Sequence, residues 1–139
     1  MSIYDHFGTD KGLETGGRWV DYGEGNGRFL IAHIAMPDSP YAKRLQALTK
    51  PYKQQIENET ADNARIREIM VRAFAEKGIL GWQGVKDRYG SDLPYSVESA
   101  IQLLSELPAL FNDLLGVARD YTNFRREEEA ADAKNFESA

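Results

Sequence analysis

The chain has 139 residues, of which 42% are hydrophobic and 28% charged, and its formal net charge is −5 at pH 7. This length is typical of one globular domain with its own core, and the composition is not that of a disordered or a membrane protein. The absence of cysteine excludes disulfides, thiolate metal ligands and a cysteine nucleophile. No apolar run approaches the roughly 20 residues that span a bilayer, and residues 1–17 lack the apolar core of a signal peptide. We therefore expect a cytoplasmic protein without a membrane partner.

The first 35 residues predict a flexible arm followed by a β-hairpin. Residues 1–17 hold four glycines among polar side chains, which raises the entropic cost of ordering this arm. Residues 18–22 and 28–35 are rich in aromatic and branched side chains and flank the turn sequence Gly-Glu-Gly-Asn-Gly. The second strand carries apolar groups on both faces, which favours cover on both sides. Leu30 and Ile34 of this strand are therefore candidate partner-binding residues.

Two helices are expected next. Ser39 followed by Pro40 indicates a capped helix that runs to about Lys50, where Pro51 ends or kinks it. Residues 62–77 repeat apolar side chains at helical spacing, and Gly78 supplies the stop. The apolar stripe of this second helix consists of Ile66, Ile69, Met70, Ala73 and Phe74.

The rest of the chain predicts a strand, a turn and a helical pair. Residues 79–87 are expected to be extended, residues 88–92 to turn around Gly90, and Ser96 to cap a helix that Pro108 separates from the next one. Such a pair can pack antiparallel or bent. Because residues 127–137 carry five carboxylates and one lysine, residues 125–139 are expected to form an acidic tail. The fold class is α+β: a small N-terminal β-hairpin or sheet followed by a mainly α-helical bundle, in one domain over residues 18–124.

Three aromatic residues surround the predicted turn. Trp82 is expected in the core, where its replacement by alanine would cost about 3 to 5 kcal/mol. Tyr89 and Tyr95 fit either a core or an interface, since tyrosine is frequent among interface hot spots. Together with Leu93, these two tyrosines are candidate partner-binding residues.

No pattern indicates catalysis. The glycines of residues 23–27 precede a strand, whereas a phosphate cradle needs a helix there. His6 and His33 are the only histidines, and neither has a second ligand at metal-binding spacing. Arginines 65, 67 and 72 are interleaved with glutamates, which disfavours nucleic acid as a partner. We therefore expect no enzyme, no metal and no cofactor.

The segment over residues 79–124 resembles one family as an ordered series. It fits the pattern W-x-x-V-x-D-x-x-G-x-x-(L/V)-P-(F/Y)-S, followed by a Leu-rich helical pair that ends near Asn-Phe. In this respect the chain is similar to the tail assembly chaperones of long-tailed bacteriophages (siphophage type), and a looser similarity extends back to Arg18 through the segments WVDYG and RFLIAHI. The matching residues are Trp82, Val85, Asp87, Gly90, Leu93, Pro94, Tyr95, Ser96, Leu103, Leu104, Leu107, Pro108, Leu110, Asn123 and Phe124.

This resemblance implies a protein that binds the phage tape measure protein in the host cytoplasm and recruits tail tube subunits during tail morphogenesis. It implies self-association as well, and a second, longer product made by a ribosomal frameshift near the end of the gene, this chain being the shorter form. Two alternatives stay open: a small nucleic-acid-binding regulator, and a structural head–tail component of the virion.

Overall fold

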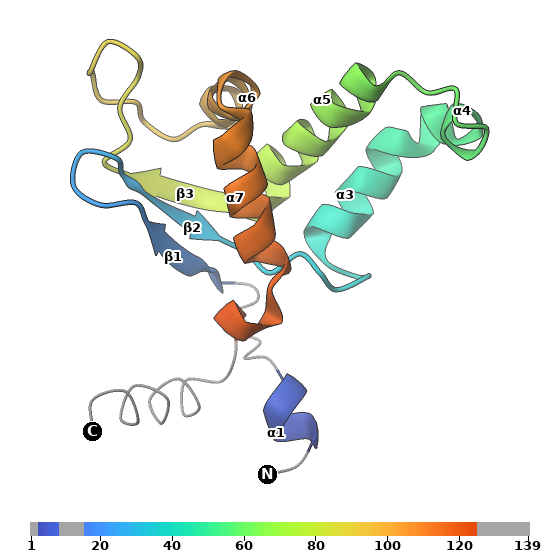
Figure 1. Ribbon diagram of the computed structural model, residues 1–139, viewed down its shortest axis with the longest axis horizontal. Helices are drawn as coiled ribbons and strands as arrows, with labels where there is room; N and C mark the ends of the chain where they lie inside the picture. Colours follow the sequence, from blue (N-terminus) through green and yellow to red (C-terminus); the bar gives the residue numbers. More distant parts are fainter. Residues whose placement is uncertain (1–2, 9–15, 125–139) are drawn as a thin grey trace.

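The structure, a computed structural model, describes residues 3–8 and 16–124 and shows a three-stranded antiparallel sheet with helices packed against it (Figure 1). This arrangement confirms the α+β class. The strands are β1 (Arg18–Asp21), β2 (Arg28–Ile31) and β3 (Ile79–Gln83). The helical elements are α1 (Ile3–Phe7), α3 (Pro40–Thr49), η1 (Lys50–Tyr52), α4 (Lys53–Glu57), α5 (Asn63–Ala73), η2 (Phe74–Gly78), α6 (Val97–Glu106), α7 (Pro108–Arg119) and η3 (Tyr121–Phe124).

The expected hairpin forms the first two strands of the sheet, whose order is β1-β2-β3. Its turn is closed by the N–H of Tyr22, which donates to the carbonyl of Gly27 over 3.1 Å. The second strand was expected to reach residue 35 but ends at Ile31, because the N–H groups of Ala32 and Ile34 donate to the helical part of the chain instead of to β1. Tertiary hydrogen bonds therefore shorten this strand.

The caps of the first long helices follow from the sequence. The Oγ of Ser39 accepts the N–H of Ala42 over 3.1 Å, and Asp62 caps α5 in the same way. The helix α3 ends at Thr49, as predicted from Pro51 to within one residue. The chain passes through the 3₁₀ turn η1 into α4, so the proline tightens and redirects the path, as its missing N–H permits at the start of a turn.

The end of α5 departs from a regular helix. Residues of η2 form a π-helical turn, which carries the chain into β3. Gly78 ends this turn as expected, and it has no room for a side chain, since a Cβ there would lie 2.3 Å from the ring of Phe74. Val71 and Ala75, which lie outside the predicted stripe, are also buried, because α5 and η2 pack against both α3 and α6.

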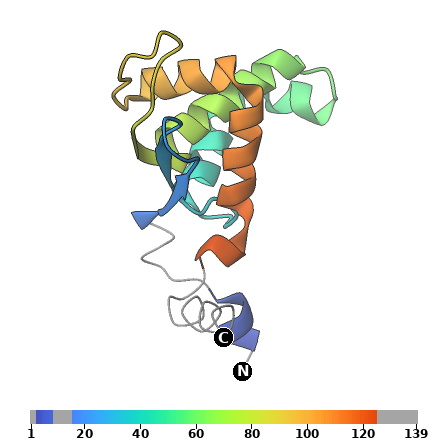
Figure 2. The same cartoon turned by 60° about the vertical axis from the view of Figure 1, so that its left-hand side comes forward.

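The core is enclosed by the sheet, by α3 and α5 with η2, and by the helical pair α6–α7, all of which contribute buried side chains to it. Figure 2 shows these elements gathered around one centre. Ser96 caps α6 through the N–H of Ser99 over 3.0 Å, and Pro108 starts α7, both as predicted. Trp82 is also confirmed in the core, with an exposed fraction of 8%. Edge-to-face rings form two rows in the core. One follows the sheet from Tyr22 through Phe29 and Trp82 to Tyr95, and the other joins α3, η2 and α7 from Tyr41 through Phe74 to Phe111.

The predicted ends of the chain are described only in part. Within the expected arm of residues 1–17, Ile3–Phe7 forms the short helix α1, with Ile3, Tyr4 and Phe7 exposed. The predicted acidic tail over residues 125–139 lies outside the described residues. Among the described residues, no helix has the length and apolar character that crossing a membrane requires.

Candidate functional site

Two turns stand next to each other at one end of the sheet, and this proximity depends on glycine. A Cβ on Gly27, in the β1–β2 turn, would lie 2.8 Å from the side chain of Val85 and 3.0 Å from the backbone carbonyl carbon of Gly84. The φ angle of Gly27 is also +81°, which side-chain-bearing residues rarely adopt. The first turn can therefore pack directly on the start of the second.

The second turn, residues 84–93, is held by its own hydrogen bonds. The N–H of Leu93 donates to the carbonyl of Val85 over 2.9 Å. The carboxylate of Asp87 accepts the N–H groups of Tyr89 and Ser91 over 2.9 and 3.0 Å. Gly90 takes a φ of +83° at the position where the sequence predicts the turn. Asp87 therefore fixes the shape of this turn from within.

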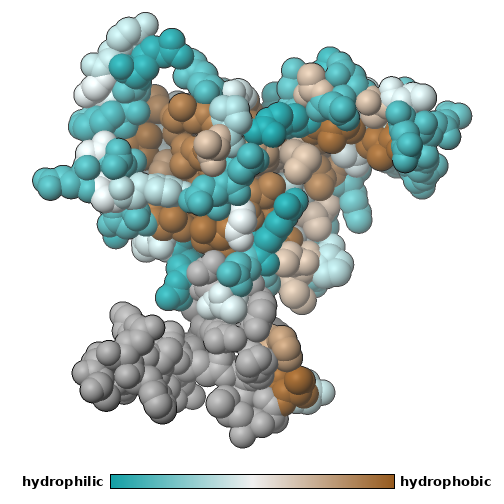
Figure 3. Space-filling view, in the orientation of Figure 1, coloured by the Kyte–Doolittle hydropathy of each residue, from teal (hydrophilic) through white to brown (hydrophobic). Residues whose placement is uncertain are grey.

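An apolar groove lies between these two turns and the corner where α6 meets α7. It comprises two adjoining hollows of about 380 and 470 Å³, both of which are lined by Asp87 and Leu103. Its surface combines apolar side chains with polar ones, and hydrophilic residues of the turns border it (Figure 3). We call it the turn groove and define it by its apolar residues Val85, Leu93, Leu103, Leu107 and Leu110.

Leu107 is the most exposed apolar residue of the turn groove, with 48% of its surface accessible. Leu93, Leu103 and Leu110 are half-buried, and Val85 is buried and packs against the core. An exposed, concave apolar surface with a polar border is typical of an interaction site. The turn groove is therefore the candidate interaction site.

The floor of the groove is held from below by two aromatic side chains. The indole N–H of Trp82 donates to the carbonyl of Leu93 over 2.7 Å. The hydroxyl of Tyr95 lies 3.0 Å from the carbonyl oxygens of both Ala75 and Ile79, and burial raises the pKa of this hydroxyl. These bonds tie the second turn and the start of α6 to β3 and η2.

Ion pairs and a tyrosine hydroxyl border the groove. Lys86 pairs with Asp92 across the second turn, and the guanidinium of Arg88 lies 3.1 Å from the carboxylate of Glu106. A hydrogen bond from the cation lowers the pKa of the carboxyl in each pair. On the opposite wall, the hydroxyl of Tyr22 donates to Asp113 of α7, and burial together with this carboxylate raises the pKa of the tyrosine.

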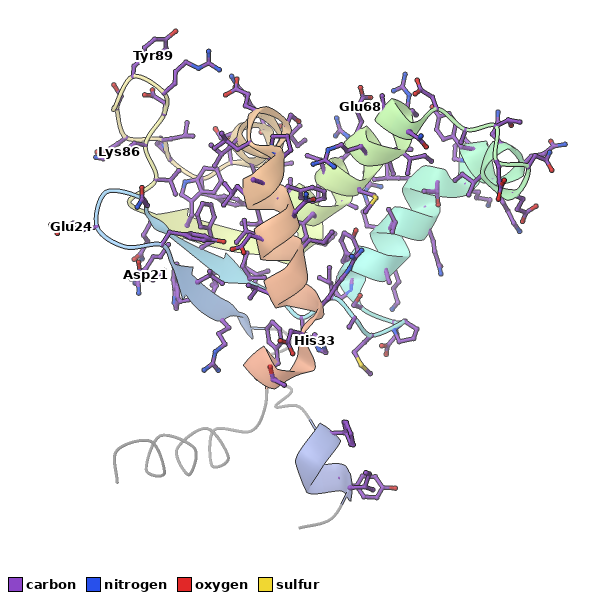
Figure 4. All side chains as sticks on the ribbon, viewed as in Figure 1. Asp21, Glu24, His33, Glu68, Lys86 and Tyr89 are labelled. Atoms are coloured by element: carbon purple, nitrogen blue, oxygen red, sulfur yellow. The ribbon has the colours of Figure 1, made fainter. Side chains whose placement is uncertain are left out.

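Of the five candidate partner-binding residues, two line the turn groove and three lie elsewhere. Tyr89 and Leu93 line the turn groove, and Tyr89 points away from the body at the tip of the turn with 85% of its surface exposed (Figure 4). Tyr95 is half-buried below the groove with its hydroxyl bonded internally. Leu30 is half-buried, and its place between the inward-facing Phe29 and Ile31 puts it on the other face of the sheet. Ile34 is only 5% exposed.

Four groove residues were not among the sequence candidates: Val85, Leu103, Leu107 and Leu110. A signal was present in the sequence, because Leu103 and Leu107 are four residues apart and so share one helical face, beside the face that the buried Ala100 and Leu104 form. Apolar residues next to the buried face of a helix indicate either that a second element packs on the helix or that an apolar patch is exposed. The structure shows that these leucines form part of the groove.

A separate hollow of about 540 Å³ lies between α3, η1, α5 and α6, and we call it the helix groove. Leu48, Ile69 and Ile101 line it, and all three are at least half-buried. Its arginines are engaged: Arg65 lies 3.2 Å from Glu68, and Arg72 lies 3.7 Å from Glu76. The helix groove therefore presents no concentrated positive charge.

Metal-binding geometry is absent from the described residues, where no three His, Asp or Glu side chains come together to hold an ion. His33, the one histidine whose side chain is described, is 5% exposed and stacks on the ring of Phe124 at 4.7 Å between ring centres (Figure 4). Its described surroundings are those of a core residue.

Comparison with known proteins gives one match. No curated protein and no solved structure matches the chain. The family model described as YdaY prophage protein matches residues 36–135, a span that begins after β2 and includes α3 to α7, the second turn and the leucines of the turn groove. The match covers well over half of the 139 residues, and it agrees with the phage origin that the sequence resemblance implied. The chain belongs to the YdaY prophage protein family.

Proposed function

We propose that this prophage protein is a tail assembly chaperone that binds the tape measure protein and recruits tail tube subunits during tail morphogenesis. Two findings support the proposal: the membership of a prophage family, and the ordered residue series over positions 82–124 that resembles tail assembly chaperones. We further propose that it acts in the host cytoplasm, as a homo-oligomer. The role requires neither catalysis nor a cofactor.

The observation that carries the proposal is the turn groove. Five residues of the resembling series, Val85, Leu93, Leu103, Leu107 and Leu110, converge there from a turn and two helices. A long tape measure helix exposes apolar surface before the tail assembles, and such surface promotes aggregation. A shallow apolar groove can cover a short stretch of it and release it later, because limited contact area gives weak, reversible binding.

Co-expression tests this proposal. The tape measure protein of the same prophage is produced with the wild-type chain, with the variant Leu107→Asp, or alone, and its soluble fraction is measured. Leu107 precedes Pro108, the first residue of α7, so aspartate at this position is a favourable helix cap and the variant should fold. The control variant is Ile56→Asp, which alters an apolar residue of α4 that is 39% exposed and outside the groove.

We expect the tape measure protein to be soluble with the wild-type chain and with Ile56→Asp, and to precipitate with Leu107→Asp or alone. Equal solubility in all four samples would contradict the proposal. Finding the chain in purified mature particles would favour the alternative of a structural virion component, because a chaperone leaves before the particle is complete.

A further inference from the structure

Carboxylates outnumber cations around the turn groove. Four acidic residues and two basic residues line its walls or bond to residues that do, which leaves an excess of two negative charges when all are ionised. Lys86 lies on the outer side of the second turn (Figure 4). The acidic residues are Asp87, Asp92, Glu106 and Asp113, and the basic ones are Lys86 and Arg88.

Both cations are already bound to carboxylates, since Lys86 pairs with Asp92 and Arg88 with Glu106. Asp87 and Asp113 instead accept hydrogen bonds from neutral groups: backbone N–H groups for Asp87 and the hydroxyl of Tyr22 for Asp113. Within residues 16–124 neither of these two carboxylates forms an ion pair. The carboxylates of Asp87 and Asp113 are therefore available to form ion pairs with a cation on a partner.

The backbone around the groove indicates what conformation that partner has. Tyr22 and Gly27 bond to each other across the first turn, and Asp87 and Ser91 across the second. The remaining walls are the helices α6 and α7, whose backbone groups are bonded internally. Because the walls offer no open strand edge, a bound segment must satisfy its own backbone hydrogen bonds, and a helix does so.

From this charge and this backbone pattern we infer that the turn groove binds an amphipathic helix that carries Lys or Arg beside its apolar face. The apolar face would lie against Leu103, Leu107 and Leu110, and the basic side chains would reach Asp87 and Asp113. The inference rests on the proposed function, because it names the kind of tape measure segment that the chaperone holds.

Two synthetic helical peptides with the same leucine face test the inference, one flanked by lysines and the other by glutamates. Calorimetry with the full chain measures both affinities at 50 and 500 mM NaCl. We expect the lysine peptide to bind at least about ten-fold more tightly at low salt, and most of this difference to disappear at high salt. Shift changes in the ¹⁵N spectrum should include the indole N–H of Trp82, which bonds to Leu93 of the groove.

Matched variants separate the two parts of the site. Asp87→Asn and Asp113→Asn keep a hydrogen-bond acceptor and remove the charge, so each should weaken the lysine peptide a few-fold, whereas Glu57→Gln in α4 should have no effect. Leu107→Ser should weaken both peptides about ten-fold. The control Ile56→Ser should leave both affinities unchanged.

Equal affinity for the two peptides would overturn the charge selectivity, and shift changes confined to the helix groove would overturn the location. These outcomes are distinct from a failure of the proposed function. If co-expression keeps the tape measure protein soluble while neither peptide binds the groove, the chaperone role stands and this inference is wrong. If the lysine peptide binds as expected but co-expression has no effect, the site stands and its partner is another protein.

Discussion

The side of the molecule beneath the turn groove and the side around α3 are stabilised in different ways. Beneath the groove, the polar groups of Trp82 and Tyr95 donate to backbone carbonyls of other elements. On the α3 side, the hydroxyl of Tyr41 is buried without a hydrogen-bond partner among the described residues. There, a half-buried ion pair of Arg44 and Glu76 links α3 to η2.

This difference shows which part of the surface has a defined backbone conformation before a partner binds. A hydrogen bond from an aromatic side chain to a backbone carbonyl fixes the position of that backbone, whereas apolar contacts and ion pairs between long side chains tolerate small shifts. The turns that border the groove therefore have a defined shape before a partner binds. Such preorganisation lowers the entropic cost of binding.

The largest expected effect comes from Trp82→Ala. We expect a loss of about 3 to 5 kcal/mol in the free energy of unfolding, because the variant removes packing between Phe29 and Tyr95 as well as the bond to Leu93. Denaturant titration measures it. Trp19→Ala is the control. Because Trp19 is 39% exposed, its replacement should lower the free energy of unfolding by about 1 kcal/mol or less. Equal losses of unfolding free energy in the two variants would show that Trp82 stabilises the groove side no more than an exposed tryptophan does.

A smaller effect is expected from Tyr95→Phe. Removing the hydroxyl leaves the carbonyls of Ala75 and Ile79 without this donor and should cost about 1 to 2 kcal/mol. Tyr89→Phe, at a side chain that is 85% exposed, should leave the free energy of unfolding unchanged. If the two variants were equally stable, the hydroxyl of Tyr95 would not contribute to holding the groove floor.

The ion pair on the α3 side should contribute less, and its contribution should depend on pH. A hydrogen bond from Arg44 holds the pKa of Glu76 below 4.5, so the folded state binds fewer protons than the unfolded state. The stabilisation is therefore present above about pH 4.5 and is lost as the pH falls through the lower, folded-state pKa. We expect the stability difference between wild type and Glu76→Gln to shrink between pH 6 and pH 3, whereas a constant difference would exclude this linkage.

The smallest expected effect is that of Tyr41→Phe. The variant removes a buried hydroxyl that has no partner among the described residues, so stability should change by less than about 0.5 kcal/mol or rise slightly. Thermal unfolding of this variant beside Tyr95→Phe makes the comparison direct. A loss as large as that of Tyr95→Phe would mean that the Tyr41 hydroxyl is bonded in solution.

Much of the fold could be predicted from local signals. Ser39 and Ser96 cap helices where the sequence places them, and the glycine-rich turn of residues 23–27 closes the first hairpin. These predictions succeed because a cap or a tight turn is decided by a few adjacent residues. The second strand was predicted too long, since its end depends on hydrogen bonds to residues more than 40 positions away.

The candidate site could be predicted only in part. Tyr89 and Leu93 belong to the turn itself, and sequence reasoning selected them as partner-binding candidates. Leu107 was recognised in the resembling series but not as a candidate, because its exposure depends on how α6 and α7 meet. The separation of Leu30 from the groove likewise depends on which face of the sheet the helices cover.

The sequence by itself determined the elements, their caps, the burial of Trp82 and the α+β class, because each depends on the spacing of nearby residues. The tertiary structure alone decided that two turns meet through Gly27, that five apolar residues of a turn and two helices form one groove, and that its cations are already paired. The physical reason is that exposure and net local charge belong to surfaces that distant segments build together, and no short stretch of sequence contains them.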